Sequence, residues 1–428
     1  MEKILIKDGY VITMDARRRV LRRGSVLLEG NRIAEVGEEV KGKADLVIEA
    51  RGMAVLPGLI NAHTHSPMTL FRGFADDMEL DPWLREKIWP VEAKLRAGDC
   101  YAGALLACAE MIRSGTTCFA DMYFFMEEVA EAVEKAGVRA VLSYGIIVPT
   151  PERLEPELKK AENFAREWDG KAEGRIRAAL SPHAPYTCGP DVWKKAVALC
   201  RELRIPIHTH LAETAEEVAR WQKEKGRSPV EWLEELGVFG VPTLAAHCVH
   251  LSEKDMEILA AHGVSAVHCP TSNLKLACGI APVVEMLKSG VNVCLGTDGA
   301  GSAGDLNMVE EMRLAALLAK VKAGDPQALP APEALGLATW RGAAALGWGK
   351  ELGTIEPGRR ADGVMIRLDQ AHLIPDYDLL ANLVYAAQGA DVDTVFVDGR
   401  FLLLEGELQT LDEEKIIGRC RELAAKFR

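Results

Sequence analysis

The chain has 428 residues, of which 48% are hydrophobic and 27% are charged, so it can bury a sizeable core and is not expected to be disordered. Its 51 Lys and Arg residues against 63 Asp and Glu residues give a net charge of −12, which argues against nucleic acid or an anionic membrane surface as the main partner. No apolar run reaches the roughly 18 residues of a membrane span, and the ten cysteines include no C-x-x-C pair. We therefore expect a soluble, cytoplasmic protein with reduced thiols.

The first part of the chain, residues 1–56, consists of short alternating segments separated by turn signals, such as ILIKDGYVITMD and SVLLEGNRIAEVG. Residues 353–428 repeat this pattern and end in a helical segment after Asp412. Strand-rich segments that lack partners of their own are expected to pair with each other. The sequence therefore predicts a small β-sandwich module built from both chain ends.

Between these ends, residues 57–352 alternate short apolar strands with helical patterns, which is typical of a parallel α/β fold. The eight candidate strands are 53–63, 116–121, 139–146, 176–183, 206–211, 243–248, 264–269 and 291–298. Eight such strands predict a (β/α)8 TIM-like barrel. A doubly wound open sheet is the alternative fold, and it is less favoured because no Gly-rich phosphate turn follows the first strand.

The longest insertion in this block, residues 66–98, directly follows the first candidate strand. It carries Phe71, Phe74, Trp83 and Trp89. A long connection with aromatic residues of its own can cover a pocket or simply pack on the rim of the barrel. Both roles are open at this point.

Most of the candidate strands carry His or Asp at or near their carboxyl ends. In a barrel all of these ends meet on one face, where such folds keep their reactive groups. The sequence therefore predicts one polar mouth. The residues concerned are His63, His65, Asp121, His183, His208, His210, His247, His268 and Asp298.

Two H-T-H pairs at this mouth are candidates for metal binding. Residues two apart on a strand point to the same side, so His63 and His65 can face one ion. His208 and His210 repeat the spacing, but only one of them need be a ligand, and the other would then be a packed or supporting imidazole. Asp298 can supply an oxygen ligand or a base, although its neighbour glycine also suits a turn carboxylate.

Three imidazoles and one carboxylate suit Zn²⁺ best and also permit Fe²⁺ or another divalent ion. Such an ion lowers the pKa of water from about 15.7 toward about 7, which is hydrolytic machinery. A bridged two-metal site would need a lysine near the end of strand 176–183, and that segment has none. We therefore expect a single metal ion.

Two further residues are candidates for proton transfer. Glu213 lies three residues after His210, where a carboxyl group can reach a substrate atom beside the ion without binding the ion. Its alternative role is the first-turn acid of a helix, favoured by the helix dipole. His247 can orient or polarise the attacking water from the sixth strand.

The segments PGLINAHTHSPMTLFRG, WLREKIWPVEAKL, SPHAPYTC, HTHLAET, AAHCVHL, HCPTSNLKLACGIAP and LGTDGAGS together resemble the amidohydrolase superfamily, most closely its 5-methylthioadenosine/S-adenosylhomocysteine deaminases. The resemblance runs over nearly the entire chain. It implies metal ligation by His63, His65, His210 and Asp298, with Asp298 also acting as base. It further implies a proton shuttle at Glu213, binding of the ribose hydroxyls by Glu92, and substrate binding by His183.

One position departs from this family. Relatives that bind the amino-acid tail of S-adenosylhomocysteine often have an Arg after the third strand, where this chain has Tyr144; Arg153 is a tentative match to a second such arginine. Loss of a bidentate carboxylate clamp favours a neutral 5′ substituent, as in methylthioadenosine or 5′-deoxyadenosine.

The sequence thus predicts hydrolytic deamination of adenosine-type nucleosides, in which Glu213 protonates the purine ring while His247 and Asp298 take the proton of the attacking water. Two rivals remain. One is another amidohydrolase that acts on guanine, a triazine or a cyclic amide, and the other is a non-catalytic scaffold. The expected partner is a small nucleoside, and a homo-oligomer is compatible with the sequence.

Overall fold

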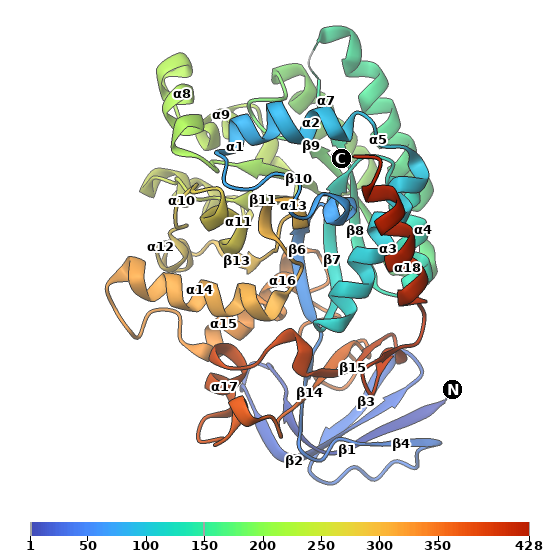
Figure 1. The fold of residues 1–428 in the computed structure, drawn as a ribbon. Coiled ribbons are helices and arrows are strands. Elements are labelled where there is room, and N and C mark those ends of the chain that lie inside the picture. Colours follow the sequence, from blue (N-terminus) through green and yellow to red (C-terminus); the bar gives the residue numbers. More distant parts are fainter. Residues whose placement is uncertain (1, 149, 428) are drawn as a thin grey trace.

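The computed structural model describes residues 2–148 and 150–427, and its centre is a sheet of eight parallel strands that closes on itself (Figure 1). Neighbouring strands follow one another along the chain. The ring closes where the backbone N–H of Asp298 donates a 3.0 Å hydrogen bond to the carbonyl of His63. The predicted (β/α)8 barrel is therefore confirmed, and the open sheet is excluded. The strands are β6 (Leu59–Thr64), β7 (Thr116–Tyr123), β8 (Arg139–Ile146), β9 (Ile176–Pro182), β10 (Ile207–Leu211), β11 (Thr243–His247), β12 (Ser265–His268) and β13 (Asn292–Leu295).

The expectation of one strand over residues 53–63 is wrong. Strand β5 (Met53–Pro57) belongs to the second sheet, and β6 begins only at Leu59. The break lies at Gly58, which packs so closely on Thr117 that an added Cβ would lie 2.0 Å from the Thr117 Oγ1. A continuous apolar run does not reveal that its two halves join different sheets, because both halves are buried.

The second sheet has nine strands drawn from both ends of the chain, and it lies below the barrel in Figure 1. Strand β14 (Gly363–Arg367) pairs antiparallel with β5, which joins the C-terminal part to the N-terminal part. The β module expected from both ends is thus present, while its limits at residues 56 and 353 stay a prediction. The other strands are β1 (Lys3–Ile12), β2 (Val20–Glu29), β3 (Arg32–Gly37), β4 (Leu46–Glu49), β15 (Val392–Val397), β16 (Arg400–Leu404) and β17 (Glu407–Leu408).

Amphipathic helices cover the outside of the barrel. Helix α4 (Met126–Ala136) buries Val129 and Val133 while Glu127 and Glu131 stay exposed, as a surface helix requires. The longer helices beside it are α3 (Ala97–Arg113), α5 (Leu154–Trp168), α7 (Pro190–Leu203), α8 (Ala215–Lys225), α10 (Glu253–Ala261) and α14 (Met308–Ala323). The shorter ones are α6 (Lys171–Gly174), α9 (Pro229–Glu235), α11 (Pro270–Lys275), α12 (Val283–Lys288), α13 (Ala300–Ala303), α15 (Ala331–Leu337) and α16 (Trp340–Ala345).

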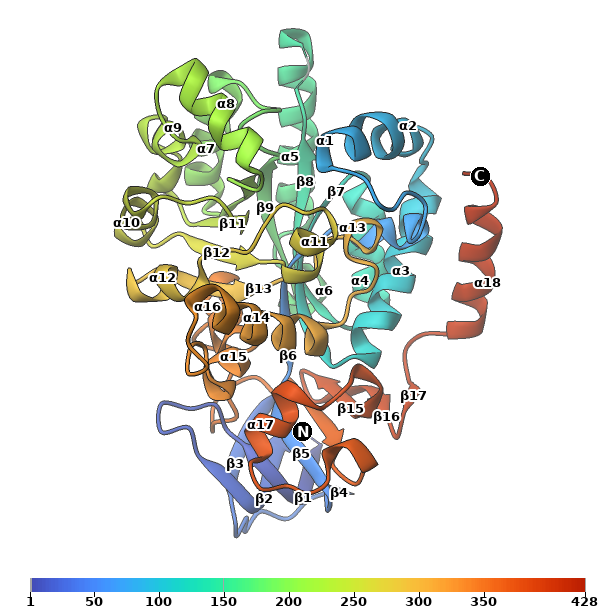
Figure 2. The same cartoon turned by 60° about the vertical axis from the view of Figure 1, so that its left-hand side comes forward.

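Two helices belong to the C-terminal part of the chain. Helix α17 (Leu379–Tyr385) packs on α15, and the closing helix α18 (Glu413–Ala424) packs on α3 (Figure 2). All ten cysteines are free and buried. Among the described residues, no helix combines the length and the apolar character that a membrane crossing requires.

A buried charged group joins the barrel to the second sheet at the start of β8. The Arg139 guanidinium donates from Nε and Nη2 to the two carboxylate oxygens of Asp362 at 3.0 and 3.1 Å, and its Nη2 lies 3.0 Å from Asp398 Oδ1. All three residues are buried. Because removal of one partner leaves uncompensated charge in the interior, such a group is far more costly to break than a surface pair.

We expect Arg139→Met to lower the free energy of unfolding by about 3–5 kcal/mol, because Asp362 and Asp398 lose their shared cation. Urea denaturation followed by circular dichroism measures the change. The control is Arg400→Met, which breaks an ion pair with Glu173 whose side chains are 65% and 61% exposed, and it should cost less than about 1 kcal/mol. Equal losses in the two variants would contradict the assignment.

Candidate active site

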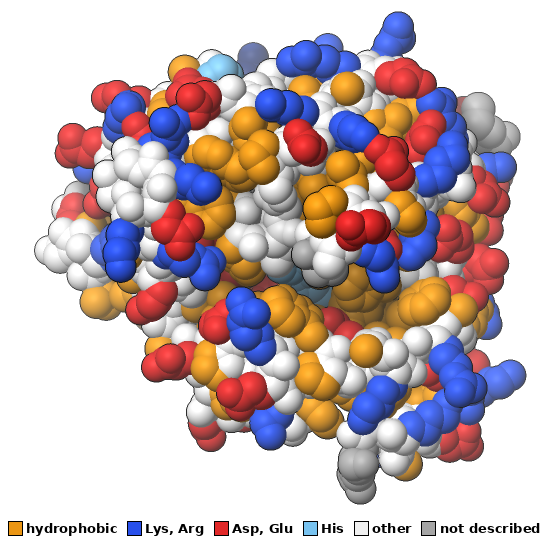
Figure 3. Space-filling model, turned by 90° about the horizontal axis from the view of Figure 1, so that it is seen from above, with side chains coloured by type: hydrophobic (Ala, Val, Ile, Leu, Met, Phe, Trp, Pro, Cys, Tyr) orange, Lys and Arg blue, Asp and Glu red, His pale blue; other side chains and the backbone are white. Residues whose placement is uncertain are grey.

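A pocket opens at the carboxyl ends of the barrel strands, and Figure 3 shows it as a hollow with histidine at its floor. The insertion of residues 66–98, here called the cover segment, lies across this end of the barrel (Figure 1 and Figure 2). Of its two possible roles, covering the pocket is the one observed, since six of its apolar side chains form part of the wall. These are Met68, Leu80, Trp83, Leu84, Ile88 and Trp89. The segment is built from η1 (Ser66–Phe71), α1 (Leu80–Pro82), η2 (Trp83–Ile88) and α2 (Trp89–Glu92).

Two imidazoles at the pocket floor face each other through nitrogen atoms that both lack a proton. The Nδ1 of His65 is bonded to the carbonyl of Met122 at 2.6 Å, and the Nδ1 of His210 to the carbonyl of His183 at 2.8 Å. A carbonyl only accepts, so each Nδ1 carries the proton and each neutral ring leaves Nε2 with a lone pair. These two Nε2 atoms are 3.2 Å apart. Two lone pairs this close repel each other, and a cation bound by both nitrogens removes the repulsion.

His63 and Asp298 complete this cluster. Asp298 Oδ1 lies 3.4 Å from His63 Nε2 and 3.2 Å from His65 Nε2. Both His63 Nε2 and Asp298 Oδ1 are buried without a hydrogen-bond partner, which is rare for polar atoms of a protein interior. His63, His65 and Asp298 present ligand atoms within 4.8 Å of one another. The donor set of imidazole nitrogen and carboxylate oxygen therefore fits a divalent metal ion.

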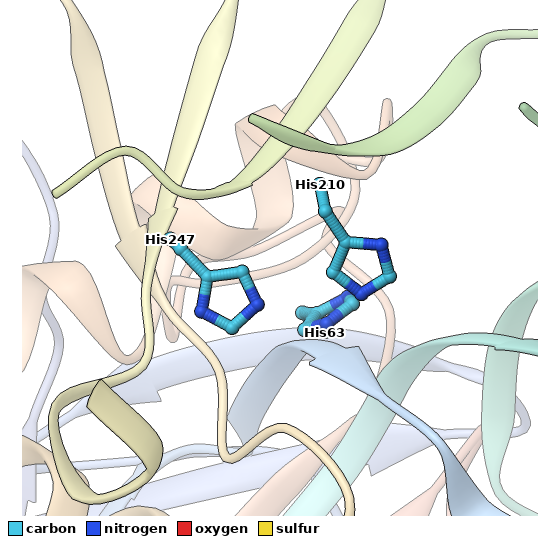
Figure 4. Close-up of side chains that lie close together, drawn as sticks. All are labelled: His63, His210 and His247. Carbon is cyan, nitrogen blue, oxygen red and sulfur yellow. The ribbon is translucent and has the colours of Figure 1, made fainter. Parts of the chain in front are cut away.

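A second group of three histidines meets the same distance requirement, and Figure 4 shows it. His63, His210 and His247 come from β6, β10 and β11 and turn their rings toward one another. His63 belongs to both groups, so the two groups describe one cluster of four histidines and Asp298.

The carboxylate of Asp298 is held in one orientation. Its Oδ2 accepts hydrogen bonds from Ser272 Oγ at 2.7 Å and Ser302 Oγ at 2.6 Å, which leaves Oδ1 to the histidines. Although burial opposes ionisation, the neighbouring His63, His65 and His247 keep the pKa of Asp298 well below its usual value. Its backbone has a φ of 66°, a strained conformation for a non-glycine residue that is typical of functional sites.

Burial also disfavours the charged form of three imidazoles of the site. It lowers the pKa of His63 to about 4 and that of His183 to about 3, and it holds the pKa of His210 well below the ordinary value. Because only a neutral imidazole has a lone pair for a metal ion, these shifts favour the ligand form at neutral pH.

Glu213 and His247 lie together at one side of the cluster, with 3.8 Å between Glu213 Oε1 and His247 Nε2. Burial raises the pKa of Glu213. Burial opposes charge on His247, but Glu213 and Asp298 outweigh it, so the pKa of His247 is raised. The other nitrogen of His247 is bonded to Asn273 Oδ1 at 2.9 Å. A carboxyl and an imidazole arranged in this way can exchange protons with a substrate.

Glu213 is not the first-turn helix acid that its sequence also allowed. Helix α8 begins at Ala215 with Thr214 as its N-cap, so Glu213 precedes the helix, and it lines the pocket while only 4% exposed. The acids of the first turn are Glu216 and Glu217.

Glu92 and His183 lie farther along the same pocket. Glu92 Oε1 accepts a 2.7 Å hydrogen bond from the Tyr123 hydroxyl, and burial raises the pKa of Glu92 to about 7. His183 follows β9, and its Nδ1 lies 3.2 Å from Thr187 Oγ1. Both side chains border the open space in which a ligand would lie. The structure thus brings together eight of the residues singled out above for a catalytic, binding or metal role. Seven line the pocket, namely His65, Glu92, His183, His210, Glu213, His247 and Asp298, and His63 lies in contact with them.

Other residues of the sequence analysis lie outside the pocket wall, among them Asp121, Tyr144, Arg153, His208 and His268. His208 is buried behind His63, and its Nε2 lies 2.8 Å from His63 Nδ1, so of the second H-T-H pair only His210 reaches the pocket. Tyr144 is not part of the pocket wall, where its neighbour Gly145 stands instead. Arg153 is 57% exposed and pairs with Glu157. The specificity argument based on Tyr144 and Arg153 therefore lacks a direct contact with the pocket.

Sequence reasoning missed two tyrosines of the pocket, Tyr123 and Tyr186. A signal for Tyr123 was present, because it lies two residues after Asp121 on β7 and residues two apart share a face of a strand. Tyr186 follows β9 in a loop, where no periodicity applies. Asp121 itself is occupied by three hydrogen bonds from Thr64 and Ser66 and braces the end of β6.

A buried acid behind the site supports α11, the helix that carries Ser272 and Asn273. Glu311 of α14 accepts a 3.1 Å hydrogen bond from the backbone N–H of Thr271, and its other oxygen is buried without a partner. Burial raises the pKa of Glu311 from 4.5 to about 8. The folded protein therefore holds this proton over a pH range in which the unfolded chain has lost it.

We expect the free energy of unfolding to fall as the pH rises from about 4.5 to about 8, because the folded state binds one more proton there than the unfolded state. Above about pH 8 this contribution is constant. Glu311→Gln should remove this part of the pH dependence, whereas Gln at the exposed Glu257 of α10 should leave it unchanged. Urea unfolding at a series of pH values measures both, and identical profiles for wild type and Glu311→Gln would contradict the expectation.

Comparison with known proteins places this geometry in a family. The model for the amidohydrolase family matches residues 54–402. The chain is 49% identical over 431 residues to a 5-methylthioadenosine/S-adenosylhomocysteine deaminase of Pelotomaculum thermopropionicum, covering 100% of this chain and 99% of the relative. It is 48% identical over 428 residues to a 5′-deoxyadenosine deaminase of Methanosarcina acetivorans, with the same coverage. A crystal structure of an adenosine deaminase from Xanthomonas campestris with bound zinc has a TM-score of 0.95 and 36% identity, covering 99% of this chain and 98% of that one. The chain belongs to the amidohydrolase family.

Proposed function

We propose that the protein is a metal-dependent deaminase that replaces the C6 amino group of adenosine-type nucleosides by oxygen and releases ammonia. Its full-length relatives are named for deamination of methylthioadenosine, S-adenosylhomocysteine and 5′-deoxyadenosine. The observation that carries the proposal is the meeting of His65 and His210 through unprotonated nitrogens, beside a buried carboxylate and Glu213, in one pocket.

In this proposal one divalent ion is held by four residues, and Zn²⁺ is its preferred identity, with Fe²⁺ as the alternative. The unpartnered buried atoms of His63 and Asp298 support the assignment. When bound, such an ion lowers the pKa of water and thereby supplies the nucleophile for hydrolysis near neutral pH. The four residues are His63, His65, His210 and Asp298.

The remaining residues bind the nucleoside and move protons. Glu213, whose raised pKa favours the protonated form, delivers a proton to the ring nitrogen next to C6 and so makes the ring electrophilic. His247 and Asp298 orient the attacking water and take its proton. Glu92 accepts hydrogen bonds from the ribose hydroxyls, and His183 contacts the substrate from the end of β9.

The pocket also bears on the 5′ substituent of the substrate. Among the described residues that line it, three are acidic and none is Lys or Arg. A carboxylate on the substrate would lose its hydration there without gaining a charged partner. We therefore propose that small, neutral 5′ groups are preferred, and the composition of the wall supports this independently of Tyr144.

We expect kcat/KM for methylthioadenosine to exceed that for S-adenosylhomocysteine by at least about 10-fold, since a hydrogen bond to a charged group contributes about 1.5–3 kcal/mol where a cation is present. The ultraviolet change that accompanies conversion of adenine to hypoxanthine measures the rate for each nucleoside in a separate assay. Comparable values for the two nucleosides would count against a neutral 5′ site.

The function itself is tested with the purified protein loaded with Zn²⁺ and a panel of adenosine, methylthioadenosine, 5′-deoxyadenosine, free adenine and guanine. We expect ammonia from the nucleosides and little from either free base, because a free base has no ribose hydroxyls for Glu92 to bind. Release from guanine in preference to any nucleoside would favour the rival hydrolase. No ammonia from any member of the panel would favour a non-catalytic role.

A further inference from the structure

Glu217 is a buried acid that the proposed reaction does not use. It lies in the first turn of α8, is 5% exposed, and contacts the backbone of Glu213. The Thr214 hydroxyl caps the helix by accepting from the Glu217 backbone N–H at 3.1 Å. An acid at this position commonly returns the bond to the backbone N–H of the N-cap residue. Here its Oε2 instead accepts from the backbone N–H of Glu213, at 2.9 Å.

The peptide that donates this bond is part of a strained turn. Ala212 has a φ of 51°, and the residues opposite it, His247 and Cys248, have φ values of 73° and 50°. Non-glycine residues persist in this conformation only where the surroundings enforce it. On one side the Ala212 carbonyl accepts 3.0 Å hydrogen bonds from the backbone N–H groups of Val249 and His250. On the other side the Glu217 carboxyl holds the next N–H group.

From these contacts we propose that Glu217 is a positioning residue that holds the Ala212 turn in place and so aims the Glu213 carboxyl at the pocket. The inference rests on the proposed role of Glu213 in deamination. Without the acceptor at Glu217, the Glu213 N–H would be buried with no partner, and the turn would relax toward an ordinary conformation. A small displacement of a proton-transferring group is enough to slow a reaction strongly.

The hydrogen bond needs an acceptor oxygen, not a charge. Burial raises the pKa of Glu217 to about 7, against the backbone hydrogen bonds from Glu213 and Ala212. Its Oε1 is buried without a partner, so the carboxyl makes no ion pair. Because a protonated carboxyl or an amide retains a carbonyl oxygen, glutamine can replace Glu217, whereas leucine cannot.

The test compares Glu217→Gln and Glu217→Leu in the metal-loaded protein, with Glu216→Gln as the matched control at the exposed neighbouring position. We expect Glu217→Leu to lower kcat by about 10- to 100-fold, with KM and metal content within about 3-fold of wild type. Glu217→Gln and Glu216→Gln should stay within about 3-fold in kcat. Hydrogen exchange of the peptide over residues 211–214 should be protected in wild type and Glu217→Gln and fast in Glu217→Leu.

Unchanged kcat and exchange in Glu217→Leu would overturn the inference, as would equal losses in the Gln and Leu variants. If Glu217→Leu does not fold, Glu217→Asp takes its place, because its carboxylate is one methylene too short for the Glu213 N–H; normal kcat in that variant would then overturn the inference. A wild-type protein without deaminase activity would refute the proposed function instead. The exchange measurement would still decide whether Glu217 holds the turn.

Discussion

Glu213→Gln should lower kcat for methylthioadenosine by a factor on the order of 10² or more, while metal content stays that of wild type. Glutamine preserves the size of the side chain but cannot donate an acidic proton to the purine ring. Because Glu213 Oε1 is 3.8 Å from His247 and the carboxyl is not a member of the metal-binding groups, the metal should be retained. Steady-state kinetics together with metal analysis of the same preparation measures both effects.

The control variant is Glu216→Gln, which alters an exposed acid three residues away and should retain kcat within about 3-fold. A Glu213→Gln protein with full activity would show that the ring nitrogen is protonated by another group, and the role assigned to Glu213 would then be wrong.

His65→Ala should lose bound metal and activity together. Its Nε2 is 3.2 Å from both His210 Nε2 and Asp298 Oδ1, so the substitution removes a central donor and leaves a cavity in its place. Substitution of a residue that only supports a metal ligand lowers metal affinity by about 10- to 100-fold, and we expect the loss of a ligand itself to lower it further. Metal content after dialysis, and the metal concentration needed to restore turnover, measure the loss.

The control for this variant is His262→Ala, since the His262 side chain is 37% exposed and lies against Glu234, away from the pocket. It should bind metal like wild type. Turnover of a nucleoside at an undiminished rate after thorough chelation of the wild-type protein would contradict both the metal site and the hydrolytic mechanism built on it.

Much of the fold could be predicted from periodicity alone. Seven of the eight candidate strands correspond to barrel strands, because short apolar runs between amphipathic helices are what a parallel barrel requires. The exception is the run over 53–63, whose two halves are equally buried and differ only in the sheet that they join. Pairing between residues that are 300 or more positions apart, such as Val55 with Met365, leaves no local pattern.

The composition of the site could also be predicted, but not its geometry. The residue types at strand ends marked His63, His65, Asp298 and the pair His208 and His210, but the strand period of two could not tell which member of that pair faces the pocket; only the family resemblance pointed to His210. The structure separates them, since His208 contacts His63 from behind. The strained turn at Ala212 had no signal in the sequence, because nothing in alanine favours a φ of 51°.

The amino-acid sequence by itself determined the kinds of chemical group that this protein brings to one face, because side-chain chemistry and strand period are local properties. Only the tertiary structure decided which ring nitrogens are free to bind a metal ion. The carbonyls that accept hydrogen bonds from Nδ1–H of His65 and His210, and so fix the tautomer, belong to Met122 and His183 on neighbouring parts of the barrel. A tautomer set by a partner from another strand exists only once the neighbouring strands have paired.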